Sequence, residues 1–213
     1  MKLKVCGMRD PANILEIAHE IKPDFMGFIF YAGSKRFVLP HIEDKATTIY
    51  ALPKEIARVG VFVNHPLHEV IGLVLRYKLA YVQLHGDEDV IYCKKLKAQN
   101  IRVIKVFRVN DTLPVSAIEA FSDTVDYFLF DTKASDYGGT GKVFDWSILA
   151  NYPVEKPFLL SGGLNLQNIE GILKAPMPYL YGIDVNSHFE VEPGLKDLDA
   201  LRALRKLMPK ESA

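Results

Sequence analysis

The sequence predicts an α/β fold, a closed (β/α)8 barrel formed by residues 1–213 as a single domain. Eight short apolar runs of strand length recur along the chain, and a segment with helically spaced apolar residues follows each of them. Eight such units in about 200–250 residues are typical of the closed barrel. The alternative is an open, doubly wound sheet, which usually has fewer strands and a glycine-rich phosphate loop after the first one. Residues 6–10 (CGMRD) are not glycine-rich, so the barrel is favoured.

The first strand begins almost at the first residue and ends at Gly7. Leu3 and Val5 share one face, whereas Lys4 and Cys6 share the other, because strand side chains alternate. Proline suits the first turn of a helix, so Asp10-Pro11 marks a helix start. In the first half of the chain, strands are expected at residues 2–7, 25–30, 57–63 and 81–86, and helices at residues 10–21, 40–51, 66–76 and 89–99.

The second half continues the same alternation. Strands are expected at residues 102–109, 127–132, 157–163 and 181–186, and helices within residues 113–121, near 144–146, at 168–173 and at 198–208. The longest irregular stretch, residues 133–142, is rich in glycine. A loop of this length is either functional and mobile or a flexible surface turn.

Composition excludes several classes of function. The chain has zero formal net charge and a pI near 7.0, so it lacks the basic field of a nucleic-acid-binding protein or of a protein that binds anionic membranes. No apolar run approaches the ~20 residues that span a bilayer, and the amino terminus lacks a signal pattern. Two distant cysteines indicate a reducing compartment. We therefore expect a cytoplasmic protein with no nucleic-acid or membrane partner.

In this fold the active site lies at the carboxyl ends of the strands. The polar residues expected at that rim are Cys6, Arg36, His85, Asp131, Ser161, and residues 184–187. Asp131 ends an apolar strand, and burial would favour its neutral form, so it is a candidate general acid. Cys6 is a candidate base if a nearby charge such as Lys4 stabilises the thiolate. The sequence leaves open which residue Lys4 contacts, and the alternatives are a buried structural cysteine and a loop-capping aspartate.

Gly162 and Gly163 follow the seventh strand, where this fold usually binds phosphate. The loop after the eighth strand, with Asn186 and Ser187, would complete that site. No histidine or carboxylate lies at ligand spacing from His85, so we expect no metal. We interpret Cys93 as a packing residue of a helix.

Several motifs together resemble the phosphoribosylanthranilate isomerase family. They lie at residues 4–7, 27–31, 34–36, 59–64, 82–86, 131–133, 137–146, 161–164 and 193–197. The resemblance runs in order from the first strand to the last helix. It implies a TIM barrel and a cofactor-free aldose–ketose isomerase, an intramolecular oxidoreductase, of tryptophan biosynthesis. The implied substrate is a phosphorylated small molecule, and the implied assembly is a monomer or a homodimer.

The resemblance also implies roles for individual residues. Asp131 matches the acid that protonates the furanose oxygen, Cys6 matches the base at the second sugar carbon, and Arg36 matches the residue facing the anthranilate carboxylate. The expected substrate-binding residues are Arg36, His85, Gly162, Gly163, Asp184, Asn186 and Ser187. One departure is His188, which stands where the family pattern has a glycine, and which either contacts the phosphate or points outward with Phe189 and Glu190.

Two other functions remain as alternatives. The first is a different sugar-phosphate isomerase or epimerase on the same barrel, which, if metal-dependent, would need clustered histidines and carboxylates at the strand ends. The second is a non-catalytic barrel that binds a phosphorylated ligand. It would keep the glycine pair but would tolerate the loss of Cys6 or Asp131.

Overall fold

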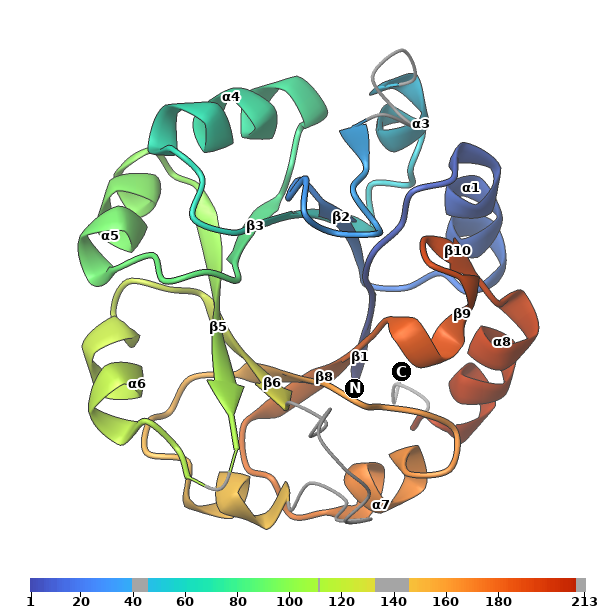
Figure 1. Cartoon of the computed structure of the whole chain (residues 1–213). Coiled ribbons are helices and arrows are strands. Elements are labelled where there is room, and N and C mark those ends of the chain that lie inside the picture. Colours follow the sequence, from blue (N-terminus) through green and yellow to red (C-terminus); the bar gives the residue numbers. More distant parts are fainter. Residues whose placement is uncertain (40–45, 111, 133–145, 210–213) are drawn as a thin grey trace.

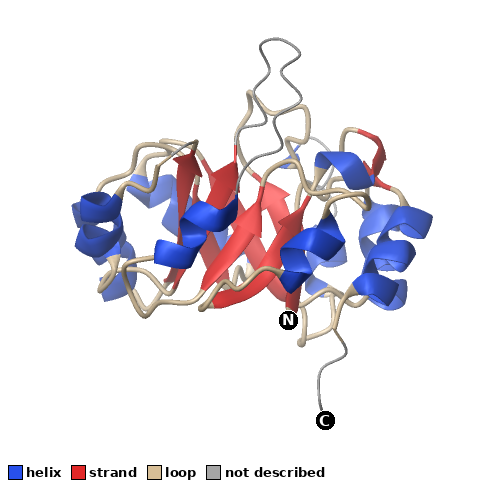
Figure 2. Ribbon diagram, turned by 90° about the horizontal axis from the view of Figure 1, so that it is seen from below, coloured by secondary structure: helices blue, strands red, loops and turns tan. Residues whose placement is uncertain are grey.

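A computed structural model describes residues 1–39, 46–110, 112–132 and 146–209. In it, eight parallel strands close into a barrel in which strands consecutive in the chain are also neighbours in the sheet. The last strand pairs with the first, so that Lys2 lies opposite Gly182 and Val5 lies opposite Val185. Viewed down the barrel, the helices surround the ring of strands (Figure 1), and a side view shows the strands at the centre with helices outside them (Figure 2). The (β/α)8 prediction is confirmed.

All eight expected strands are present. They are β1 (Lys2–Val5), β2 (Phe25–Ile29), β3 (Ala57–Phe62), β4 (Tyr81–Leu84), β5 (Arg102–Val109), β6 (Tyr127–Thr132), β7 (Phe158–Ser161) and β8 (Leu180–Val185). The sequence predicted that the seventh strand extends to Gly163, which is wrong, because β7 ends at Ser161. Gly162 and Gly163 have φ values of 89° and 63°, a left-handed conformation that ends an extended strand.

The helices follow the strands as expected. They are α1 (Pro11–Glu20), α3 (Ala46–Tyr50), α4 (Leu67–Tyr77), α5 (Val90–Ala98), α6 (Val115–Phe121), α7 (Ile169–Lys174) and α8 (Leu198–Leu207), with 3-10 helices η1 (Trp146–Asn151) and η2 (Ser187–Phe189). Asp10, Asp89 and Asp197 cap α1, α5 and α8, and each accepts a hydrogen bond from the backbone N–H three residues later. The expectations for residues 40–45, for the loop at 133–142 and for residues 144–145 lie outside the described residues.

A short hairpin after β8 was not predicted. Its strands are β9 (Glu190–Glu192) and β10 (Leu195–Lys196), and Gly194, with φ of 90°, lies in the turn between them. Strands of two or three residues are too short to produce an alternating apolar pattern, which explains why the sequence did not reveal them. The hairpin places Glu190 and Lys196 beside the carboxyl end of the barrel.

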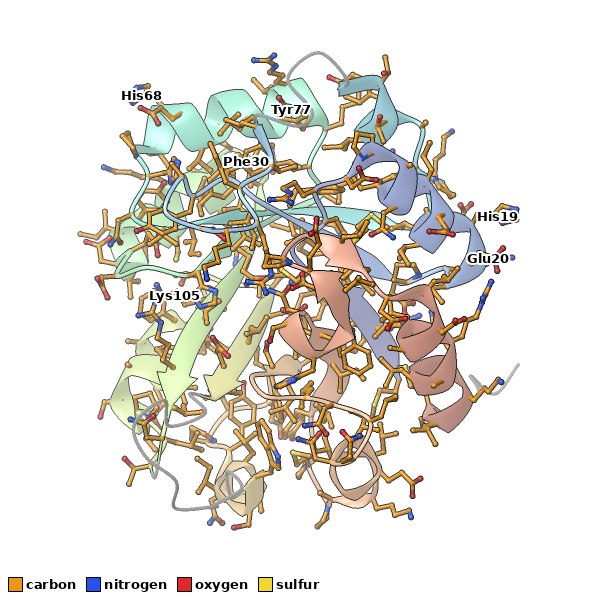
Figure 3. The ribbon with its side chains drawn as sticks, turned by 45° about the vertical axis from the view of Figure 1, so that its right-hand side comes forward. His19, Glu20, Phe30, His68, Tyr77 and Lys105 are labelled. Carbon is orange, nitrogen blue, oxygen red and sulfur yellow. The ribbon has the colours of Figure 1, made fainter. Side chains whose placement is uncertain are left out.

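The core has two layers. Side chains from the inward faces of the strands fill the barrel, and their buried members are Phe25, Val59, Tyr81, Ile104, Val106, Leu129 and Leu159. A larger layer packs between strands and helices. It includes Phe30, directly after β2, and Tyr77, the last residue of α4, whose ring centroids are 5.4 Å apart (Figure 3). No helix in the described ranges is long and apolar enough to cross a membrane.

Candidate active site

Cys6 extends β1 on the inward face of the barrel. Its backbone N–H donates to the carbonyl of Val185 at 3.0 Å, and the residue is only 5% exposed. Gly27 of β2 lies beside it, since a Cβ built at Gly27 would be 2.7 Å from Sγ of Cys6 and 3.2 Å from Nζ of Lys4. The missing side chain at Gly27 therefore makes room for the thiol and the amine.

Lys4 contacts Asp184, which answers the question that the sequence left open. Nζ of Lys4 lies 2.8 Å from Oδ2 of Asp184, and the two side chains are 0% and 4% exposed. Burial alone would lower the pKa of Lys4, but the charges of Asp184 and Cys6 outweigh burial and raise it. Burial raises the pKa of Asp184 against the opposing charge of Lys4. Lys4 therefore stays charged at the base of the site.

The same environment acts on the Cys6 thiol. Burial raises its pKa, and Lys4 is the strongest charge acting in the opposite direction. Asp184 adds to the rise, while Lys196 opposes it. The resting thiol is therefore protonated at neutral pH, and the Lys4 ammonium group favours the thiolate that a base would need.

Asp131 lies one residue before the end of β6, on the inward face and two residues beyond Leu129. Its Oδ2 lies 3.3 Å from Nε2 of His85, and the two side chains are 28% and 25% exposed. The expectation that an apolar strand desolvates this carboxyl group is therefore wrong, because Asp131 meets both solvent and an imidazole at the rim. Nε2 of Gln83 lies 3.4 Å from Nδ1 of His85.

Arg36 lies in the loop after β2, but its guanidinium fork is already occupied. Nε lies 2.9 Å from both carboxylate oxygens of Glu190, and Nη2 lies 2.6 Å from Oε2. Nε and Nη2 of Arg36 are therefore already taken by Glu190. The alternative in which Phe189 and Glu190 point outward is wrong, since Phe189 is fully buried and the Glu190 side chain is 3% exposed.

The loops after β7 and β8 are where the sequence predicts the phosphate site, and that site stays a prediction. Gly162 and Gly163 have consecutive positive φ angles, a backbone conformation that residues with a side chain rarely adopt. Asn168 donates to the carbonyl of Gly163 at 2.9 Å and holds this turn. Ser187 and His188 are exposed. His188 does not adopt a positive φ, so its backbone does not require the glycine of the family pattern.

Gly7 lies between Arg36 and the loop after β8, so all three are neighbours at the carboxyl end of the barrel. Its φ is 75°, and a Cβ there would be 2.6 Å from Cδ of Arg36 and 2.7 Å from Oδ1 of Asn186. Asn186 accepts a hydrogen bond from Nζ of Lys196 at 2.8 Å. The turn at Gly7, after β1, therefore lies between Arg36, which is expected to contact the substrate carboxylate, and the loop of Asn186, which is expected to contact the phosphate.

Sequence reasoning missed three residues of this rim: Gln83, Glu190 and Lys196. Gln83 could have been found, because it lies two residues before His85 and strand alternation puts both on the same face. Lys196 lies in one of the motifs shared with the family, at residues 193–197. Its contact with Glu190 could not be predicted, because the hairpin that brings the two residues together was not predicted. A single chain offers no local signal that Glu190 is buried.

A cavity of about 460 Å³ lies beside His85, between the ends of β4 and β5. Its lining includes Arg108, Phe121 and the buried ion pair between Lys105 (labelled in Figure 3) and Glu88, whose charged atoms are 3.2 Å apart. Within the described ranges, no group of three His, Cys, Asp or Glu side chains could hold a metal ion.

The barrel and its rim define an enzyme of the (β/α)8 class that carries candidate acid and base groups at the carboxyl ends of its strands. Comparison with known proteins identifies the family. The family model of N-(5'-phosphoribosyl)anthranilate (PRA) isomerase matches residues 3–206. The chain therefore belongs to this family, which confirms the resemblance and the isomerase class.

Individual relatives agree. The N-(5'-phosphoribosyl)anthranilate isomerase of Parabacteroides distasonis is 45% identical over 204 residues, covering 95% of this chain and 90% of that protein. Monomers of the dimeric phosphoribosylanthranilate isomerase from Thermotoga maritima superpose with a TM-score of 0.81 at 31% identity, covering 97% of each chain. A phosphoribosylanthranilate isomerase in complex with reduced 1-(o-carboxyphenylamino)-1-deoxyribulose 5-phosphate has a TM-score of 0.79 and 32% identity, covering 97% of each chain.

Proposed function

We propose that this chain converts N-(5-phosphoribosyl)anthranilate to 1-(2-carboxyphenylamino)-1-deoxyribulose 5-phosphate, a step of tryptophan biosynthesis, by a cofactor-free Amadori rearrangement. The observation that carries the proposal is the placement of Cys6 and Asp131 on the inward face of one rim, in a chain of this family. The charge of Asp131 acts on Asp184, and that of Asp184 acts on Cys6, so the three groups share one electrostatic environment.

In the first step, Asp131 donates its proton to the ring oxygen of the sugar. The bond between that oxygen and the first carbon breaks, and the nitrogen lone pair forms an iminium group. A carboxyl group at the open rim can reach the ring oxygen, and His85 holds it in place through the 3.3 Å contact. Asp131 leaves this step as a carboxylate.

In the second step, the Cys6 thiolate removes the proton from the second carbon. The released electron pair forms the double bond between the first two carbons and neutralises the iminium nitrogen. Lys4 favours the thiolate before the transfer, and Asp184 balances the charge of Lys4 throughout. The enolamine then takes the proton of the Cys6 thiol at its first carbon and gives its hydroxyl proton to the Asp131 carboxylate, which yields the ketone and restores both groups.

The remaining expected contacts complete the proposal. The glycine pair with the loop of Asn186 and Ser187 would hold the phosphate, and Arg36 would face the anthranilate carboxylate through Nη1, since Nε and Nη2 are taken by Glu190. Asp184 would support Lys4. We propose that the chain acts as one domain, as a monomer or a homodimer. Both cysteines are free and buried, which suits a reducing cytoplasm.

Turnover tests the proposal directly. The purified protein should consume N-(5-phosphoribosyl)anthranilate, followed as the loss of its fluorescence, and Cys6→Ser should lower the rate about 10²–10⁴-fold while unfolding at the same temperature. A folded wild-type protein without turnover would contradict the function and favour another sugar-phosphate substrate. Wild-type speed in Cys6→Ser would contradict the role of the thiol.

A further inference from the structure

The hairpin after β8 contributes Glu190 and Lys196 to a cluster of charges with Arg36, and the reaction steps above use neither hairpin residue. The Glu190 carboxylate accepts from Nε and Nη2 of Arg36, from Nζ of Lys196 at 2.5 Å and from the backbone N–H of Gly194 at 3.2 Å. Its side chain is 3% exposed, and that of Lys196 is 0% exposed. A buried carboxylate with this many donors is held in one orientation.

Lys196 is itself fixed to the barrel. Its backbone N–H donates to Oδ1 of Asn13 at 2.8 Å, and Nδ2 of Asn13 donates back to its carbonyl at 3.1 Å. Its ammonium group also donates to Oδ1 of Asn186 in the loop after β8. The cluster therefore joins α1, the hairpin and the phosphate-side loop to Arg36.

The charges of the cluster do not cancel. Arg36 and Lys196 contribute two positive charges and Glu190 contributes one negative charge, so one positive charge is left in excess. Glu190 holds one edge of the guanidinium group, while Arg36 Nη1 makes no hydrogen bond within the described ranges, and the side chain is 20% exposed. The Nη1 group is therefore left to meet an anion.

We propose that Glu190 is a positioning residue, which turns the guanidinium group of Arg36 so that Nη1 faces the aryl carboxylate of the substrate, and that Lys196 is the counter-charge that keeps Glu190 in place. This inference rests on the proposed function. It makes recognition of the carboxylate depend on the direction in which the Nη1 group points rather than on the number of positive charges.

Two ligands distinguish an effect of the direction of Nη1 from an effect of net charge. One is the reduced 1-(o-carboxyphenylamino)-1-deoxyribulose 5-phosphate, and the other is the same molecule without its carboxyl group. The ratio of their dissociation constants, measured by calorimetry, reports carboxylate recognition alone. Glu190→Gln adds one net positive charge, so a pure charge effect would increase the preference for the carboxylated ligand. Our proposal expects the preference to fall about 10-fold or more, with the carboxyl-free ligand bound as before.

Glu88→Gln is the matched control, because it removes another buried carboxylate paired with a lysine at the same rim without touching Arg36. It should keep the wild-type ratio. Arg36→Lys keeps the charge but loses the fork, and it should lower the ratio as Glu190→Gln does; it also replaces that variant if Glu190→Gln does not fold. An unchanged or increased ratio in the folded variant would overturn the inference. Turnover of the wild-type protein is measured in a separate assay. A failure of the proposed function is therefore distinguished from a failure of this inference, which concerns the ratio of dissociation constants.

Discussion

Nζ of Lys4 lies 2.8 Å from Oδ2 of Asp184, across the seam at which the barrel closes. The two residues are direct partners in the ladder between β1 and β8, the first and last strands. Both strands lead into the site, one to Cys6 and the other to Asn186. The ion pair therefore ties the closure of the barrel to the geometry of the candidate base.

We expect Asp184→Asn to lower the free energy of unfolding by about 3–5 kcal/mol, because it leaves the Lys4 charge buried without a partner. Denaturant unfolding followed by circular dichroism measures this change. A variant that unfolds at the wild-type denaturant concentration would show that the pair does not stabilise the seam.

The double variant Lys4→Met with Asp184→Leu is the matched control. It replaces both charges by apolar groups of similar size, which often restores stability. Its stability should therefore exceed that of Asp184→Asn. Its turnover should nevertheless stay low, since the thiol loses the charge that most strongly favours the thiolate.

The sequence predicted the positions of the candidate acid and base because both depend on local pattern. Alternation within β1 and β6 is enough to turn Cys6 and Asp131 inward at strand ends. The partners of the charged groups could not be predicted in this way. Lys4 and Asp184 are 180 positions apart, and Arg36 and Glu190 are 154 positions apart. These contacts exist only after the barrel has closed and the short hairpin has folded over its rim.

The pH dependence of thiolate absorbance tests the ionisation of Cys6. Burial raises the pKa of this thiol, so the thiolate fraction at neutral pH is small and grows with pH. We expect the ultraviolet absorbance of the Cys6 thiolate to rise as the pH increases through neutrality and beyond about pH 8, by up to tenfold per unit. A thiolate signal that is already complete between about pH 6 and 8 would contradict a thiol of raised pKa.

Cys93 provides the control for that experiment. Its pKa is raised to about 11, chiefly by burial, and it packs from α5 into the layer between strands and helices. Cys93→Ala should retain the wild-type pH profile, whereas Cys6→Ser should remove most of the activity. The difference in ultraviolet thiolate absorbance between wild type and Cys6→Ser then reports the ionisation of Cys6 alone.

A double-mutant cycle tests whether His85 acts through Asp131. Asp131→Asn should lower kcat/KM about 10²–10⁴-fold, and His85→Ala should lower it about 10-fold by removing the 3.3 Å contact between Nε2 and the acid. In the Asp131→Asn background, His85→Ala should have little further effect. Additive losses in kcat/KM would mean that His85 has a role separate from Asp131. His68 is an exposed histidine of α4 (Figure 3), and the control variant His68→Ala should leave kcat/KM unchanged.

Gly27→Ala tests how tightly the thiol is placed. A Cβ at this position would lie 2.7 Å from Sγ of Cys6, so the thiol must move, whereas Gly27 itself has no positive φ to strain. A displacement of this kind can cost about 100-fold in turnover, and overpacking typically costs about 1–3 kcal/mol of stability. Gly72→Ala on α4 is the matched control, since a Cβ there meets nothing within 4 Å. It should keep full activity and gain up to about 1 kcal/mol, because alanine favours a helix. Wild-type turnover in Gly27→Ala would show that the base does not depend on the position of the Cys6 sulfur.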